Sequence, residues 1–444
     1  MKRPFIFLIV FILAALFLAA PHLAAQQPGR SITGGSGSTS SSTSGSGLTG
    51  GSTLTGTVAD SAGGAPLAGV SVFLNNTSRG TTTGNNGAFR LEIPKGAYQL
   101  VLSAIGYATL VVDVNGSHLP SALHLLMHGK ATELTAVTVE PYDKHGWSKW
   151  GRFFMENFIG TGENAAECRL KNHEVLRFYY SRRTNRLSVT ATEPLHIENN
   201  ALGYNLTYQL EGFRADLSNK LVQYFGYPYF QPMITTKGDR EKLWEFKRRQ
   251  AYAGSMLHFM RSLYAGRTIS QGFLVEKEVT GRNEEKHRVK EIYRPDFQKP
   301  GNFPMDTLHY FWDVLRQPDI ITWKVVVPPD SILTIDADST RELFFPRPVI
   351  VLYGVREKNT GGELKTSGLQ LVTPRPLKVE ENGSYYPPQE VLDTGYWALS
   401  EKIANLLPVD YGLKTQPADP AANQPDHLPS QPLAFIHSAS RSGH

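Results

Sequence analysis

The chain has 444 residues, of which 41% are hydrophobic, 19% charged and 11% aromatic. This composition excludes a chain that is disordered throughout, and the length predicts two or three domains. The formal net charge of +5 is too small for the dense basic surface of a nucleic-acid-binding protein. Cys168 is the one cysteine, which excludes an intrachain disulfide and a cysteine-based metal cluster.

The first 25 residues have the three parts of a secretory signal peptide. The short basic start Lys2–Arg3 precedes an apolar run from Phe5 to Ala20, and a small-residue cleavage site follows at Ala25. The alternative is a membrane anchor, but the run is shorter than the ~20 residues that span a bilayer. We therefore expect an exported protein with no transmembrane segment after signal cleavage.

Two segments of biased composition separate and end the folded regions. Gly, Ser and Thr dominate residues 26–52 and predict a flexible linker. Pro, Ala, Gln and Ser are frequent in residues 413–444 and predict a disordered tail. The expected folded regions are therefore residues 53–139 and 140–412.

Short β-type runs alternate with turn signals in residues 53–139, which predicts an antiparallel β-sandwich. Phe89, Leu91 and Ile93 alternate with polar residues, as in a half-buried strand. Residues 84–87, Gly-Asn-Asn-Gly, predict a hairpin tip, because Asn and Gly tolerate positive φ. The predicted strands are residues 53–58, 70–74, 81–83, 88–93, 98–104 and 108–114.

This region resembles the carboxypeptidase regulatory-like domain family. The residues that carry the resemblance are Gly56 and Val58, residues 66–70, Gly80–Thr81, residues 87–89 and residues 105–107. The same module is similar to the N-terminal extension of Bacteroidetes TonB-dependent receptors. The resemblance implies a seven-stranded transthyretin-like β-sandwich without peptidase activity, because the domain is the non-catalytic companion in that family. It also implies a location in the periplasm or at the outer membrane.

Residues 140–412 predict an α+β region with antiparallel sheet and a few helices, so the whole chain is predicted to be mainly β. Aromatic residues recur at helical spacing between Trp147 and Phe158, either as a buried helix face or as a patch facing a glycan or a membrane. A second helix is expected over 239–265 and a short third over 393–407, whereas residues 266–412 otherwise return to strands. Strands are expected at residues 175–181, 187–192, 202–210, 320–327, 348–355 and 368–372.

The region is also similar to uncharacterised envelope proteins of Bacteroidetes, which brings no known chemistry with it. Residues 168–172, 194–199, 202–204 and 249–259 carry this likeness.

The usual enzyme motifs are absent from the sequence. It lacks the His-Glu-x-x-His string of zinc peptidases, the Gly-x-Ser-x-Gly string of serine hydrolases and the phosphate-binding loop of nucleotide-binding proteins. Cys168 is expected to be a buried apolar cysteine rather than a nucleophile. Carboxylates paired in space stay open as an alternative, since their spacing is not visible in a sequence. We therefore expect no enzyme activity, no cofactor and no metal site.

The clearest electrostatic feature is the segment from Lys237 to Arg294, with 14 basic and 8 acidic residues. Its densest run, Lys247, Arg248 and Arg249, is the candidate contact for an anionic ligand such as lipopolysaccharide phosphate or an acidic glycan. The competing interpretation is a solvated helix face with internal ion pairs.

Two functional hypotheses remain from the sequence. The first is an exported, non-enzymatic envelope protein with a binding or assembly role at the outer membrane. In this hypothesis it is associated with TonB-dependent uptake, and its partner is an outer-membrane protein or an envelope glycan. The second is a carbohydrate-binding or carbohydrate-active protein with an aromatic platform for sugars. Its candidate glycan contacts are Tyr204, Tyr208, Tyr227 and Tyr229.

Overall fold

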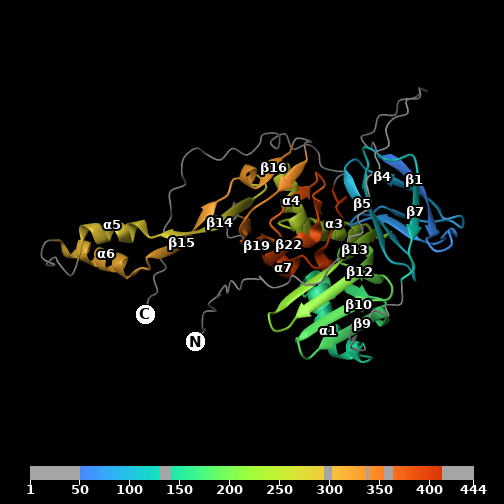
Figure 1. Cartoon of the computed structure of the whole chain (residues 1–444), viewed down its shortest axis with the longest axis horizontal. Helices are drawn as coiled ribbons and strands as arrows, with labels where there is room; N and C mark the ends of the chain where they lie inside the picture. Colours follow the sequence, from blue (N-terminus) through green and yellow to red (C-terminus); the bar gives the residue numbers. More distant parts are fainter. Residues whose placement is uncertain (1–50, 131–141, 295–302, 337–339, 355–363, 413–444) are drawn as a thin grey trace, which may run out of the picture. The chain divides into compact units, whose positions relative to one another are not determined.

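The computed structural model describes residues 51–130, 142–294, 303–336, 340–354 and 364–412 (Figure 1). The predicted signal peptide 1–25, nearly all of the linker 26–52 and the tail 413–444 lie outside the described residues. The described part is mainly β, as predicted, with several antiparallel sheets and with helices between them. No helix in these ranges has both the length and the apolar character needed to cross a membrane.

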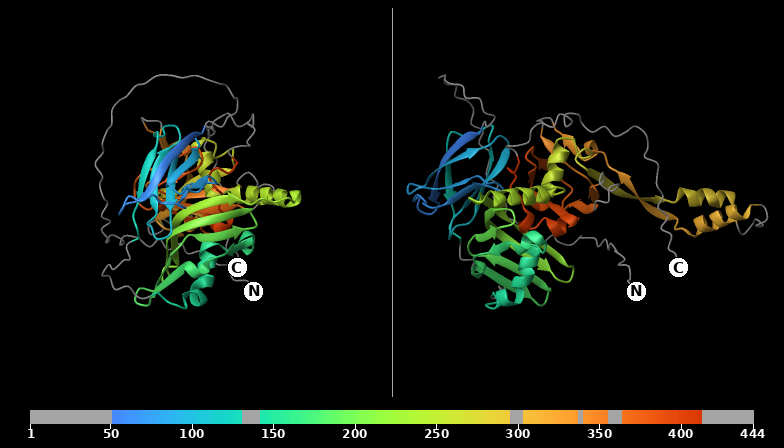
Figure 2. Two further views of the ribbon diagram at one scale, coloured as in Figure 1. Left: turned by 90° about the vertical axis from the view of Figure 1, so that its right-hand side faces the viewer. Right: turned by 180° about the vertical axis from the view of Figure 1, so that it is seen from behind.

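The N-terminal domain is the predicted β-sandwich of seven strands. Figure 2 shows its strands in blue and cyan. One sheet has the order β4-β1-β7 and the other β3-β2-β5-β6. Alternate side chains of β4 are buried, which confirms the pattern expected from its sequence. The strands are β1 Ser52–Asp60, β2 Ser71–Leu74, β3 Gly80–Thr82, β4 Ala88–Ile93, β5 Ala97–Ser103, β6 Leu110–Asn115 and β7 Leu123–Met127.

A six-stranded antiparallel sheet follows, with the order β8-β11-β12-β10-β9 and with β13 also paired to β12. Helix α1, Gly146–Phe158, packs on it through Phe154 and Phe158, which are fully buried. The Phe154 ring lies 5.0 Å from Phe213 of the sheet, and the Phe158 ring 5.1 Å from Tyr208. The aromatic helix face is therefore core. The other elements here are α2 Glu163–Ala166, β8 Cys168–Leu170, β9 Leu176–Ser181, β10 Arg186–Ala191, β11 Leu195–Asn199, β12 Tyr204–Asp216 and β13 Leu221–Pro232.

The helix expected over 239–265 is two helices. α3 spans Gly238–Tyr252 and α4 spans Met256–Tyr264. The helix is interrupted at Gly254, whose φ is +80°. Ser255 then caps α4 by accepting a hydrogen bond from the His258 N–H at 3.0 Å. Residues 239–265 therefore do not form the single helix that was predicted.

A second large core lies against a five-stranded antiparallel sheet with the order β15-β14-β18-β19-β22. Phe259 of α4 and Trp397 of α7, both buried, pack in this core with their rings 5.4 Å apart. The expected helix 393–407 is shorter than predicted, because Asp393 belongs to β22. A small sheet, β16-β17-β20-β21, completes the region. The elements are β14 Phe273–Arg282, β15 Ile320–Val326, β16 Leu333–Ile335, β17 Arg341–Leu343, β18 Val349–Tyr353, β19 Lys365–Leu371, β20 Leu377–Val379, β21 Tyr385–Tyr386, β22 Val391–Gly395 and α7 Tyr396–Ser400.

Two helices that the sequence analysis missed lie between β14 and β15. α5 spans Glu284–Ile292 and α6 spans Met305–Arg316. Figure 2 shows them as a pair at the end of the ribbon formed by β14 and β15. Their buried side chains form a core of their own. We call the described residues between 278 and 323 the arm.

The turn between β2 and β3, residues 75–79, joins the sandwich to the six-stranded sheet. The Asn76 N–H donates to the Pro228 carbonyl at 2.8 Å, and the Thr77 carbonyl accepts from the Phe230 N–H at 3.0 Å. Because both contacts use backbone groups, they depend on the course of the chain more than on side-chain identity. We call residues 75–79 and their partners in β13 and in the segment 409–410 the seam.

Candidate functional site

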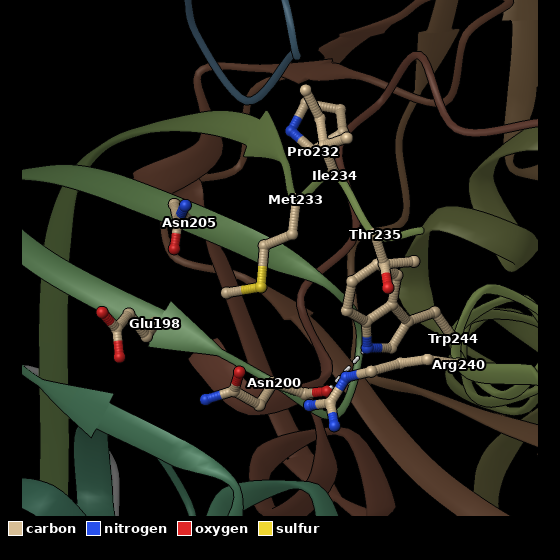
Figure 3. A pocket seen from close by; sticks show the side chains of 9 residues that line it. All are labelled: Glu198, Asn200, Asn205, Pro232, Met233, Ile234, Thr235, Arg240 and Trp244. Carbon is tan, nitrogen blue, oxygen red and sulfur yellow. Dashed lines mark hydrogen bonds between the residues drawn. The ribbon is translucent and has the colours of Figure 1, made fainter. Parts of the chain in front are cut away.

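An open depression of about 600 Å³ lies beside the six-stranded sheet (Figure 3). β11 and β12 supply Glu198 and Asn205, and Asn200 follows β11 directly. The other side consists of the chain that leaves β13 and the first turns of α3. Its lining residues are Glu198, Asn200, Asn205, Pro232, Met233, Ile234, Thr235, Arg240 and Trp244.

Trp244 fixes α3 at the edge of this depression. Its indole N–H donates to the Asn200 carbonyl at 2.8 Å, and its ring packs against the backbone of Gly203. A Cβ at Gly203 would lie 2.3 Å from the ring, so only glycine permits this approach. The Arg240 guanidinium lies 5.5 Å from the ring centroid. Trp244 is 5% exposed and therefore anchors the helix, with little ring surface left for a ligand.

The polar side of the depression presents a carboxylate, amides and a guanidinium. Glu198 forms an ion pair with Lys171 at 3.1 Å. Asn205 and Arg240 are exposed, and Ile234 at the rim is 97% exposed. This lining suits a polar ligand held by hydrogen bonds. In the described ranges, no group of histidine, cysteine or acidic side chains is arranged to hold a metal ion.

The predicted anionic-ligand residues lie on α3, and the structure uses two of them internally. The Arg248 Nε donates to the Leu202 carbonyl at 2.7 Å, and its guanidinium lies 4.1 Å from the Tyr204 ring centroid. Lys247 forms an ion pair with Glu163 at 3.3 Å. Both contacts tie α3 to neighbouring elements, so these two side chains are poor candidates for a ligand.

Arg249 is the third member of that predicted cluster and remains exposed on the helix. It lies 3.9 Å from Glu245, one turn earlier on α3. A pair between exposed side chains at this spacing stabilises a helix only slightly, and water screens it.

The predicted tyrosine platform is not assembled as expected. Tyr204 and Tyr208 are each 4% exposed and belong to the core under the six-stranded sheet, which corrects the prediction for these two residues. Tyr227 and Tyr229 on β13 are half-buried. The Tyr229 ring lies 5.3 Å from Phe73 of the sandwich, so it belongs to the packing beside the seam. Tyr204 and Tyr208 lie on the face of β12 that packs into this core.

Cys168 is buried, as expected, and its Sγ lies 3.3 Å from the Asn164 carbonyl. Burial raises the pKa of its thiol to about 12, so the thiolate is disfavoured at neutral pH. This environment is unsuited to a nucleophile.

The arm is a second candidate surface, which the sequence analysis missed. Its large apolar side chains are between 37% and 64% exposed, although α5 and α6 bury their own small core. The signals that could have revealed α5 are local: Asn283 caps the helix by accepting from the Lys286 N–H at 3.0 Å, and two glutamates follow it. The exposed residues are Ile292, Met305, Tyr310, Ile320 and Trp323.

Comparison with known proteins identifies one part of the chain. Residues 54–139 match the family model of the CarboxypepD_reg-like domain, which confirms the resemblance of this region. No curated protein matches the chain.

Solved structures give only distant likenesses. A chain of a cohesin–X-dockerin complex from Acetivibrio cellulolyticus is 21% identical. The match covers 17% of this chain and 57% of that one, with a TM-score of 0.15. A DUF3823 family protein from Bacteroides ovatus is 9% identical over 42% of this chain and 82% of that one, with a TM-score of 0.15. A putative membrane-associated protein of unknown function from Bacteroides fragilis is 11% identical. The match covers 78% of this chain and 95% of that one, also with a TM-score of 0.15.

Proposed function

We propose that this chain is an exported, non-enzymatic protein of the cell envelope with a binding or assembly role at the outer membrane. The signal-peptide pattern of residues 1–25 supports export. The regulatory-like domain at residues 54–139 supports a binding role, because such domains accompany catalytic or transport domains without catalysing a reaction themselves. A place beside TonB-dependent uptake is part of the proposal, since the same module extends such receptors in Bacteroidetes.

The observation that carries the proposal is the arm. A two-stranded ribbon holds a pair of helices that bury a core of their own, and five large apolar side chains remain partly exposed on these elements. These side chains come from α5, α6 and β15, and apolar side chains that are exposed together are typical of a surface that binds another protein. We therefore assign the arm as the contact for an outer-membrane protein.

A binding role also agrees with the chemistry of the described residues. The thiol of Cys168 is buried and protonated, and the depression presents hydrogen-bonding groups rather than a nucleophile beside a base. The alternative function is carbohydrate binding, for which the depression would be the site, since Tyr204 and Tyr208 are buried.

The test is site-specific cross-linking in intact cells that produce the protein. A photo-reactive amino acid replaces Ile320, which is 64% exposed on the arm, and in a matched control it replaces Leu399, which is 78% exposed on α7. We expect light to join the Ile320 position, and not the Leu399 position, to an outer-membrane protein that mass spectrometry identifies.

Equal cross-linking from both positions, or recovery of the protein in the cytoplasmic fraction, would overturn the proposal. A screen of the purified chain against polysaccharides separates the alternative. Retention or hydrolysis of a polysaccharide would favour the carbohydrate function.

A further inference from the structure

Helix α3 is attached to the protein along one side only. Trp244 is its one buried residue, and Arg248 adds hydrogen bonds to the carbonyls of Leu202 and Gly203 on that side. The opposite side of the helix, which includes Leu243 and Phe246, is exposed. A helix held in this way presents its opposite face to any surface that the protein approaches.

The outward face of α3 carries two apolar side chains. Leu243 is 50% exposed and Phe246 is 48% exposed. They are three residues apart and are therefore neighbours on the helix surface. Ile234, which lies just before the helix and lines the same depression as Arg240, is 97% exposed.

Positive charge surrounds this pair. The segment from Lys237 to Arg249 holds six lysines and arginines against three acidic residues. With 3.6 residues per turn, Lys242 and Arg249 lie on one side of the Leu243–Phe246 pair and Lys247 lies on the other. Of the acidic residues, Glu245 pairs with Arg249, and Asp239 lies one turn before Leu243. The whole chain has a net charge of +5, so a large part of the excess positive charge lies in this one helix.

These two features together select the partner. Three partly exposed side chains supply much less apolar area than the ~800 Å² that each side of a stable protein interface buries. The apolar side chains on this face are few, but lysine and arginine flank them, an arrangement that lets apolar groups enter the headgroup region of a membrane while the charges stay at its surface. Lipid phosphates provide the complementary negative charge.

We propose that the outward face of α3, together with Ile234, binds the surface of an anionic membrane. Leu243 and Phe246 enter the headgroup region, and Lys242 and Arg249 contact lipid phosphates. The attachment is reversible and weakens at high salt, because the apolar contribution is small and the charges are exposed. The inference rests on the proposed envelope location.

The test uses the chain without its predicted signal peptide and sedimentation with lipid vesicles. One set contains phosphatidylcholine alone, and the other adds about 30% phosphatidylglycerol to supply negative charge. We expect binding to the anionic vesicles, at least tenfold weaker binding to the neutral vesicles, and loss of binding as salt is raised.

Two double variants separate the apolar and charged contributions. L243S/F246S removes the apolar pair and K242E/R249E reverses two exposed charges, and each should weaken binding to anionic vesicles by about tenfold or more. Leu399→Ser, which removes an even more exposed apolar side chain on α7, is the control and should bind like the parent chain. Circular dichroism should show the same melting temperature for all of them, because the changed side chains are exposed.

Three results would overturn the inference: no binding to anionic vesicles, equal binding by all variants, or a photo-reactive residue at Phe246 that joins a protein in cells instead of lipid. None of these affects the Ile320 experiment, which tests the proposed function by itself. Loss of the Ile320 cross-link with vesicle binding retained would leave the lipid-binding face standing and remove the arm as the protein contact.

Discussion

Glu401 lies between the two largest hydrophobic cores of the described residues. The chain before it places Trp397 in the core of the five-stranded sheet, and the chain after it places Ile403 in the core of the six-stranded sheet. The pKa of the Glu401 carboxyl is raised to about 8, first by burial and then by the neighbouring Asp393 carboxylate. Glu401 is therefore protonated in the folded protein at neutral pH.

The groups around Glu401 and Asp393 do not supply a strong positive charge to stabilise their ionised forms. Burial raises the pKa of Asp393, and the Lys402 ammonium only partly opposes that increase. Burial also lowers the pKa of Lys402. The hydroxyls of Tyr224 and Tyr385 have raised pKa values, first because they are buried and then because both carboxylates are near, so they remain neutral.

The raised pKa of Glu401 makes stability depend on pH with a definite sign. In the unfolded chain this carboxyl ionises near pH 4.5, whereas in the folded chain it ionises near pH 8. Its contribution to stability is therefore complete below pH 4.5 and is lost as the pH rises toward 8. Since one pH unit in this window corresponds to about 1.4 kcal/mol, the free energy of unfolding should fall by on the order of 4 kcal/mol across it.

Glu401→Gln tests this prediction, because the amide keeps the shape of the acid and does not ionise. Urea unfolding at pH 5 and pH 8 should show the variant to be more stable than the parent chain at pH 8, with most of that difference gone at pH 5. Glu381→Gln at an exposed glutamate is the control and should leave the pH dependence unchanged. The same difference between Glu401→Gln and the parent chain at both pH values would contradict the prediction.

At the scale of elements, the break between α3 and α4 depends on Gly254. Its φ of +80° is strained for any residue with a side chain, and a Cβ there would lie 2.5 Å from the Tyr353 ring. The Gly254 carbonyl also accepts from the Trp397 indole N–H at 2.9 Å, and its N–H donates to the His258 ring at 3.1 Å. Burial lowers the pKa of His258 to about 4, so the ring is neutral and can accept that bond.

Gly254→Ala should therefore lower the free energy of unfolding by about 3 kcal/mol, from backbone strain and from the contact with Tyr353. Denaturant unfolding at one pH measures the loss. Gly238→Ala, at the first residue of α3, is the control, because a Cβ there meets nothing within 4 Å. Equal stability of the two variants would show that the break does not require glycine.

This break also shows where prediction from the sequence reaches its limit. The sandwich strands were predicted well, because alternation is a local signal. A turn does form at residues 84–87, but it connects β3 of one sheet to β4 of the other and is therefore not the predicted hairpin tip. The helix prediction for 239–265 failed because it passed over a local signal, Gly254 followed by the capping Ser255, and because the hydrogen bond from Trp397 to Gly254 is not visible in the sequence. α5 and α6 were missed although Asn283 provides a local cap, since the expectation of strands extended over the whole of 266–412.

The candidate site was less predictable than the fold. The basic run 247–249 was recognised from its composition, but the contact of Arg248 with the Leu202 carbonyl depends on tertiary structure. Tyr204 and Tyr208 share the apolar face of β12, whose alternation with polar residues already favours burial over an open platform. Glu198 and Arg240 line the same depression from different elements, and their spacing in the sequence does not predict this.

At the scale of the whole molecule, the seam couples the sandwich to the rest of the described chain. The Ser78 hydroxyl donates to Asp410 Oδ2 at 2.5 Å, and the Ser78 N–H donates to the same carboxylate at 3.1 and 3.2 Å. The Val409 N–H donates to the Asn76 carbonyl at 2.7 Å. Arg261 holds the segment in turn by donating to the Val409 carbonyl at 2.8 Å. The regulatory-like domain is therefore bonded to the rest of the described chain by hydrogen bonds and is not connected to it by the covalent chain alone.

Asp410→Ala should loosen this seam without unfolding either region, because each keeps its own core. Hydrogen bonds to a charged group contribute about 1.5–3 kcal/mol, so amide exchange in residues 75–79 should become roughly 10- to 100-fold faster. Hydrogen-exchange mass spectrometry measures this, with Asp330→Ala at an exposed turn as the control. Unchanged protection of residues 75–79 in Asp410→Ala would mean that the backbone bonds to β13 hold the seam alone. Faster exchange would show that Asp410 helps to hold the sandwich against the six-stranded sheet.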